Sequence, residues 1–113
     1  METCLDCVRK HLAKAMCYLD ESKVGPYAHY IWRAIGELGL AEDEAANEYN
    51  DFANAIRLER MKIMEFACAK ENFNVLANHG FKYKLYLPDN SIPRLIDRAS
   101  ELLFIKKKGK AHG

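Results

Sequence analysis

Apolar residues recur at helical spacing along most of the chain. Between residues 4 and 22 they fall every three or four positions and form one stripe, a pattern typical of an amphipathic helix. Thr3 and Asp6 fit a capping box, in which each side chain would bond a free backbone N–H at the helix start. Gly25-Pro26 interrupts the pattern, and a second helix is expected from Tyr27. The first stripe consists of Leu5, Val8, Leu12, Ala15, Met16 and Leu19.

Helical spacing continues from about residue 27 to about residue 71, which allows either one long helix or two. Tyr49-Asn50-Asp51 is the candidate break, because Asn50 or Asp51 would cap a separate helix. Gly36 and Gly39 lie inside the first part, each at a cost of about 1 kcal/mol relative to alanine. They predict either a close approach by a neighbouring helix or a kink near Gly39.

The segment from Phe52 to Glu71 is apolar on two sides, which predicts a central position in a bundle or a place in a subunit interface. One side contains Phe52, Ile56, Ile63, Phe66 and Ala67. The other side contains Leu58, Met61 and Cys68.

The remaining chain predicts an extended arm and a last helix. Residues 81–87 alternate as in a strand, and with no partner strand evident they form an arm or pair with a second copy of the chain. Ser91 caps the last helix, which would end at a basic flexible tail, residues 106–113, after a single domain over 1–105. The fold class is therefore all-α, with three to four helices in a small bundle or hairpin and the arm before the last helix.

Composition narrows the class of protein. The chain has 113 residues, of which 50% are hydrophobic, so one domain with a real core is expected. No run of apolar residues approaches the ~20 needed to span a membrane, and no secretory leader is evident, so a cytoplasmic protein without membrane contact is expected. The formal charge of +1 divides unevenly, because residues 1–50 carry 5 basic and 9 acidic residues and residues 51–113 carry 12 and 7. Such a division either is ordinary unevenness of the surface charge or favours head-to-tail contact between halves or subunits.

Cys4, Cys7 and His11 are the strongest chemical signal. On a helix their i, i+3, i+7 spacing places them within an arc of about 60°, and two thiolates and an imidazole suit Zn²⁺. Cys68, His29, His79 or a partner subunit would supply a fourth ligand. The alternatives are a packed helix edge and a redox dithiol at a helix N-terminus, although the βαβ context of redox proteins is absent. The uneven cysteine spacing favours a reducing compartment, and a Cys4–Cys7 bond inside a helix would be strained.

Other chemistry finds weaker support in the sequence. No phosphate-binding glycine loop, H-E-x-x-H or G-x-S-x-G motif occurs, so a non-enzymatic protein is expected. Nucleic-acid or nucleotide-like ligand binding is an alternative, because aromatic residues lie among the basic residues of the arm, although the acidic first half opposes it. Its candidate residues are Arg57, Arg60, Lys82 and Lys84.

The first half of the chain carries a family resemblance. It opens with Cys4-Leu5-Asp6-Cys7-Val8-Arg9-Lys10-His11-Leu12, followed by a Gly-Pro turn, Ala34-Ile35-Gly36-Glu37-Leu38, acidic Ala41-Glu42-Asp43-Glu44 and later Ile56-Arg57-x-x-Arg60. This resembles small helical proteins of tailed bacteriophages that begin with a C-x-x-C-x-x-K/R-H-L helix. The resemblance implies a viral accessory or virion-associated origin, in the host cytoplasm or the virion, and implies no mechanism.

The leading hypothesis is a self-associating binding or assembly module without enzymatic activity or a cofactor, whose partner is a second copy or another protein. A zinc-stabilised regulatory domain and a nucleic-acid binder are the alternatives. The predicted interface residues are Phe52, Leu58, Met61, Cys68, Phe81, Tyr83 and Leu85.

Overall fold

The computed structural model describes residues 2–21, 27–78 and 91–112, with the side chains of all of these except 27–28, 70–78 and 110–112. In chain order, the described helices are α1 (Leu5–Glu21), α2 (Tyr27–Ala45), α3 (Asn50–Asn78) and α4 (Ile92–His112). The predicted all-α class is confirmed. The predicted arm, residues 81–87, lies outside the described residues.

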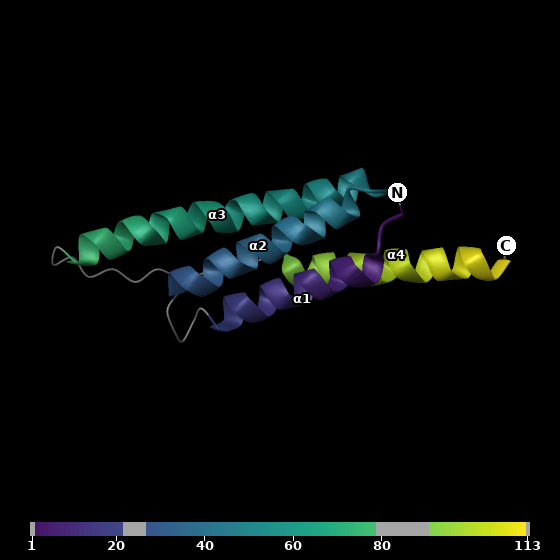
Figure 1. Ribbon diagram of the computed structural model, residues 1–113, viewed down its shortest axis with the longest axis horizontal. Coiled ribbons are helices and arrows are strands. Elements are labelled where there is room, and N and C mark those ends of the chain that lie inside the picture. Colours follow the sequence, from purple (N-terminus) through teal and green to yellow (C-terminus); the bar gives the residue numbers. More distant parts are fainter. Residues whose placement is uncertain (1, 22–26, 79–90, 113) are drawn as a thin grey trace.

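The four helices form a row rather than a closed square. α1 lies between α2 and α4, α2 lies between α1 and α3, and α3 contacts α4 only marginally. Consecutive helices run in opposite directions with their axes along the longest dimension of the molecule (Figure 1). The molecule measures 65 × 21 × 18 Å. α1 and α2 are therefore the inner pair, and α3 and α4 lie at the two edges.

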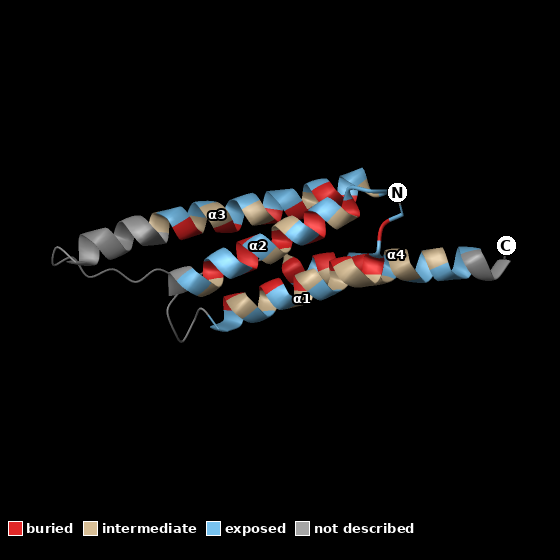
Figure 2. Cartoon of the chain, viewed as in Figure 1, coloured by how far each residue is buried: buried red, intermediate tan, exposed pale blue. Residues whose placement is uncertain are grey.

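The core consists of the predicted stripes. Figure 2 shows buried residues on the sides of the helices that face one another. Each fully buried leucine or isoleucine side chain contributes about 1.5–3 kcal/mol to the free energy of unfolding. The stripe of α1 is confirmed, with Met16 only partly buried. The largest fully buried side chains are Phe52, Leu12, Ile31, Leu38, Ile56, Ile63, Ile92 and Val8.

α2 and α3 are separated by a turn at residues 46–49. Residues 27–71 therefore form parts of two helices and not one long helix. The reversal begins where Tyr49 N–H donates to Ala45 O at 2.8 Å, and the first turn of α3 forms where Ala53 N–H donates to Tyr49 O at 2.9 Å. The predicted break at Tyr49-Asn50-Asp51 is therefore correct to within a few residues. α3 already includes Asn50 and Asp51, so Tyr49 precedes the helix in place of the predicted caps.

The start of α1 differs from the predicted capping box. α1 begins at Leu5, so Cys4 is the capping residue, and its Sγ accepts the Cys7 N–H at 3.2 Å. Asp6 pairs instead with Arg9, Nη2 to Oδ1 at 2.8 Å. Thr3 lies one position too early to cap the helix, and its buried side chain contacts the α2–α3 turn.

α4 continues through the segment predicted as a flexible tail. The helix extends to His112, so residue 106 is not its boundary. The physical reason is that Lys106 is partly buried and forms ion pairs with Glu2 and Glu48, two acidic residues far away in the sequence.

Neither explanation predicted for the α2 glycines is needed. A Cβ built on Gly36 would meet nothing within 4 Å among the described residues, and one on Gly39 would make an ordinary contact of 3.9 Å with Arg60 Cδ. The helix runs through both positions without a break. The two glycines are thus not required by close packing.

Candidate functional site

The outer face of α3 is defined here by four exposed residues, Leu58, Met61, Glu65 and Cys68, and all of these except Glu65 were predicted for an interface. Leu58 is 69% exposed and Met61 50%, and Cys68 is an exposed free cysteine. The four residues follow a 3-4-3 spacing, so they lie on one side of the helix, opposite the buried stripe. The sequence prediction of two apolar sides on this helix is therefore confirmed, one buried and one exposed.

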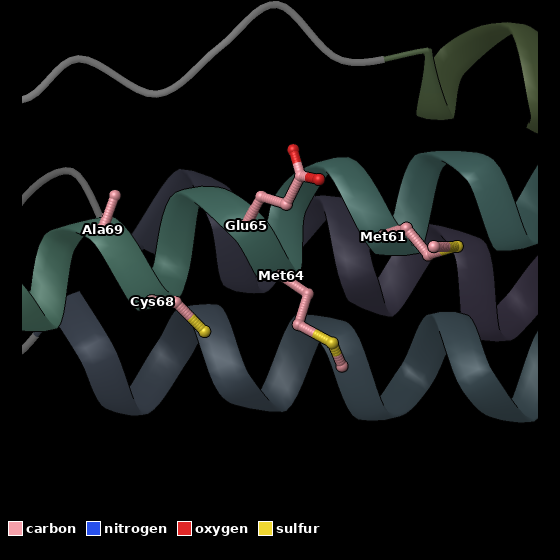
Figure 3. Close-up of a pocket in the computed structure, with 5 residues that line it drawn as sticks. All are labelled: Met61, Met64, Glu65, Cys68 and Ala69. Atoms are coloured by element: carbon pink, nitrogen blue, oxygen red, sulfur yellow. The ribbon is translucent and has the colours of Figure 1, made fainter.

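A shallow depression of about 480 Å³ lies along this part of α3. Its lining comes from one helix: Met61, Met64, Glu65, Cys68 and Ala69 (Figure 3). Met64 and Cys68 point toward one edge of this face, and Glu65 and Ala69 point toward its other edge (Figure 3). Methionine side chains adapt to irregular surfaces, which suits such a face to contact with another helix.

Phe52, which was predicted for an interface, is a core residue. It is 1% exposed and lies in the core, with the Arg98 guanidinium 5.3 Å from its ring centroid. The reason is its register on α3, where it shares the buried stripe of Ile56 and Ile63. Phe81, Tyr83 and Leu85, also predicted for the interface, lie outside the described residues.

Arg57 and Arg60, predicted to contact nucleic acid, instead bind the buried carboxylate of Glu42. Arg57 Nε donates to Oε2 at 3.0 Å, and Arg60 Nη2 and Nε donate to Oε1 at 2.8 and 3.1 Å. Burial raises the pKa of Glu42, but the hydrogen bonds from Arg60 and Arg57 outweigh it and hold the pKa below its ordinary value. The single carboxylate of Glu42 thus compensates one of the two guanidinium charges. Lys82 and Lys84 lie outside the described residues.

The residues of the predicted zinc motif are brought together only in part. Cys4 and Cys7 form a disulfide with their Cα atoms 5.2 Å apart, a separation that such bonds ordinarily have. The sequence led to the expectation of a strained bond. That expectation rested on placing Cys4 inside the helix, whereas Cys4 precedes α1 and is free to adopt a non-helical conformation. Bonded sulfurs offer no thiolate to a metal.

His11 has a different partner. Its Nδ1 lies 2.6 Å from Oε2 of Glu37, which links α1 to α2. Within the described ranges, no three His, Cys, Asp or Glu side chains form a group that could hold a metal ion. Cys17 and Cys68 are exposed free cysteines.

A polar cluster that the sequence analysis missed fixes the chain before α1. This N-terminal clamp consists of Glu2, Thr3, Glu44, Glu48 and Lys106. Thr3 Oγ1 donates to Glu44 O at 3.0 Å and accepts the Glu48 N–H at 3.0 Å, while the Thr3 N–H donates to Glu48 Oε1 at 2.5 Å. In the sequence, Thr3 alone pointed to this cluster, and a capping box at the start of the first helix explained Thr3 equally well.

Lys106 closes the clamp from α4. Its Nζ lies 2.7 Å from Glu2 Oε1 and 3.2 Å from Glu48 Oε1. The Thr3 N–H and then Lys106 hold the pKa of Glu48 below its ordinary value, and Glu2 and then Glu48 raise the pKa of Lys106. Residues from the start, middle and end of the chain are thus joined beside the Cys4–Cys7 pair.

Fold and site together define a small all-α protein with an exposed helix face and a disulfide at the start of its first helix. No protein-family model, curated protein or solved structure matches this chain. No helix in the described parts has the length and apolar character needed to cross a membrane.

Proposed function

We propose that this protein is a non-enzymatic assembly module that self-associates through the outer face of α3. The observation that carries the proposal is the exposure of Leu58 and Met61 on the same side of a helix whose opposite side is buried. Contiguous exposed apolar surface on a small protein is typical of an interaction site. The occupant we infer is a second copy of the chain.

Charge favours an antiparallel pair of α3 helices related by a two-fold axis near Met61. Arg57 and Glu65 lie four residues before and four residues after Met61, so reversal of the second copy places each opposite its unlike counterpart. Arg57 donates its Nε to Glu42 and stays 55% exposed, so part of its guanidinium reaches the surface. Met61 of each copy would meet at the axis, with Leu58 beside it.

Sedimentation velocity at tens of micromolar protein tests the proposal. We expect a species of twice the chain mass of 13.0 kDa. Met61→Lys should give monomers, because two like charges would meet at the axis. Leu40→Lys is the matched control, since Leu40 is 51% exposed but lies on α2, and it should leave the dimer intact. A monomer in the unmodified protein overturns the proposal.

A charge variant tests the inferred orientation. Glu65→Arg would place like charges opposite each other, and we expect the dimer to weaken by about 0.2–1 kcal/mol for each surface pair. Asp51→Arg, an exposed position outside the proposed contact, provides the control. Equal effects of the two variants would contradict the antiparallel arrangement.

The N-terminal resemblance to small tailed-phage proteins supports a phage accessory or virion-associated role for this module. A zinc-stabilised domain is the second candidate, favoured by the proximity of Cys4 and Cys7. After reduction this pair would supply two thiolates, and His11 would join them only by leaving Glu37.

A further inference from the structure

The Cys4–Cys7 disulfide has the position and exposure of a reactive dithiol rather than of a structural cross-link. It closes a loop across only three residue steps, and such a short loop constrains the unfolded chain far less than a long one. Cys4 is exposed and Cys7 is half-buried. We propose that this pair is a redox-exchange site, at which a small thiol opens the disulfide by attacking Cys4 and Cys7 closes it again.

The helix start distinguishes the two sulfurs. Cys4 Sγ accepts the Cys7 N–H at 3.2 Å. It lies at the N-terminus of α1, where free backbone N–H groups favour negative charge. A thiolate released at Cys4 is stabilised there and remains accessible to a co-reactant. The Glu44 carboxylate, which accepts the Cys4 N–H at 2.7 Å, acts in the opposite direction and moderates this effect. Cys4 is thus the sulfur that a small thiol attacks during reduction and the nucleophile during oxidation. Cys7 is the resolving sulfur, which closes the protein disulfide.

The surroundings hold both cysteines in place when the bond opens. On one side of Cys4, Thr3 is fixed to the α2–α3 turn by the N-terminal clamp. On the other side, Leu5 and Val8 are buried in the core and fix the first turn of α1. The Cα separation of 5.2 Å should therefore survive reduction, which keeps the second thiol within reach of the first.

The exchange balances with a low-molecular-weight thiol as reductant. Its thiolate attacks Cys4 Sγ, a mixed disulfide forms on Cys4, and the Cys4–Cys7 bond breaks with the electron pair leaving on Cys7, which takes up a proton. A second thiolate then attacks the small-molecule sulfur of the mixed disulfide and releases Cys4. Two thiols are oxidised to one disulfide, and the protein gains two electrons and two protons. Oxidation by the small disulfide runs the same steps backward.

The protein carries its own reference thiols for a test. Cys17 is an exposed free cysteine farther along α1, and Cys68 is an exposed free cysteine on α3.

The first experiment removes these two thiols so that only the Cys4–Cys7 pair reacts. It uses the folded C17S/C68S variant in glutathione buffers of graded ratio, followed by acid quenching, alkylation and mass measurement. We expect reversible interconversion of the dithiol and disulfide forms while the helical circular dichroism is unchanged. A pair that stays oxidised in excess dithiothreitol until the protein is denatured overturns the proposal.

The second experiment assigns the roles of the two cysteines. In Cys7→Ser, Cys4 should form a mixed disulfide with oxidised glutathione on the order of tenfold faster than Cys17 in the same chain, because only Cys4 lies at a helix start. In Cys4→Ser, the half-buried Cys7 should react more slowly than Cys17. Equal rates at Cys4 and Cys17 in Cys7→Ser would remove the basis for a dedicated exchange site.

Discussion

Thr3 Oγ1 donates a hydrogen bond to the backbone oxygen of Glu44, 41 residues later in the chain. This contact adds to the bond from the Asn47 N–H, which also donates to the Glu44 carbonyl, at 3.3 Å, at the end of α2. The same hydroxyl accepts the Glu48 N–H, so one buried side chain fixes the turn between α2 and α3. The start of the chain thereby helps to define where the second helix ends.

Replacing this hydroxyl should destabilise the fold. Thr3→Val keeps the shape of the side chain but leaves the Glu44 carbonyl only the Asn47 N–H, at 3.3 Å, and the Glu48 N–H only the Ala45 carbonyl, at 3.4 Å. We expect the free energy of unfolding in urea to fall by about 0.5–1.5 kcal/mol, the net value of a typical hydrogen bond. Thr3→Ser keeps the hydroxyl and should lose less. A Thr3→Val variant as stable as the unmodified protein would contradict the role of the clamp.

The clamp also predicts how stability depends on pH. The pKa of Glu48 is lowered from its ordinary value of 4.5 by the Thr3 N–H and then by Lys106. The contribution of Glu48 to the free energy of unfolding is therefore fully present above pH 4.5 and is lost as the pH falls through the lowered pKa. Lys106 behaves in the reverse sense, because its pKa is raised above 10.5 by Glu2 and then Glu48, and its contribution is lost only at higher pH.

Urea unfolding between pH 7 and pH 3 measures this dependence. Glu48→Gln should flatten the acid side of the curve relative to the unmodified protein, since the titrating carboxyl is gone. Glu42 titrates in the same direction, because its pKa is also lowered, and is unaffected by this substitution. If the acid slope of Glu48→Gln equals that of the unmodified protein, Glu48 is not paired as described.

Gly36 is a place where stability can be gained. It lies exposed inside α2, and an added Cβ would meet nothing within 4 Å among the residues described. Gly36→Ala should raise the free energy of unfolding by about 0.5–1 kcal/mol, because alanine loses less backbone entropy in a helix. Gly39→Ala, with an ordinary contact to Arg60, should act in the same direction. A loss of stability in Gly36→Ala would show that the helix needs the glycine.

Metal content distinguishes the disulfide from the zinc alternative. A Cys4–Cys7 bond removes both thiolate ligands, so protein purified without chelator or reductant should contain zinc well below one per chain by elemental analysis. The Cys4→Ser/Cys7→Ser variant is the control for incidental metal. Zinc near one per chain, lost in this variant, would establish the zinc-stabilised domain and overturn the redox-exchange site.

The sequence predicts the features that depend on neighbours within one helix. The stripes, the class and the break near Tyr49 follow from spacing along the chain, and Leu58 and Met61 are correctly placed on a second side of α3. Thr3 and Lys106 could not be placed in this way, because their partners lie 41 to 104 residues away and only the packed helices bring them together. The conformation of Cys4 could not be predicted either, because a shift of one residue at the helix start decides whether its backbone is helical.

The order of helices in the row has a consequence for how the protein opens. α3 is covered by α2 and only marginally by α4, so it can separate at residues 46–49 while α1, α2 and α4 stay together. Amide hydrogens of α3 should then exchange with solvent deuterium through this partial opening, before those of the inner helices α1 and α2. A partner seated on α3 would slow that exchange first.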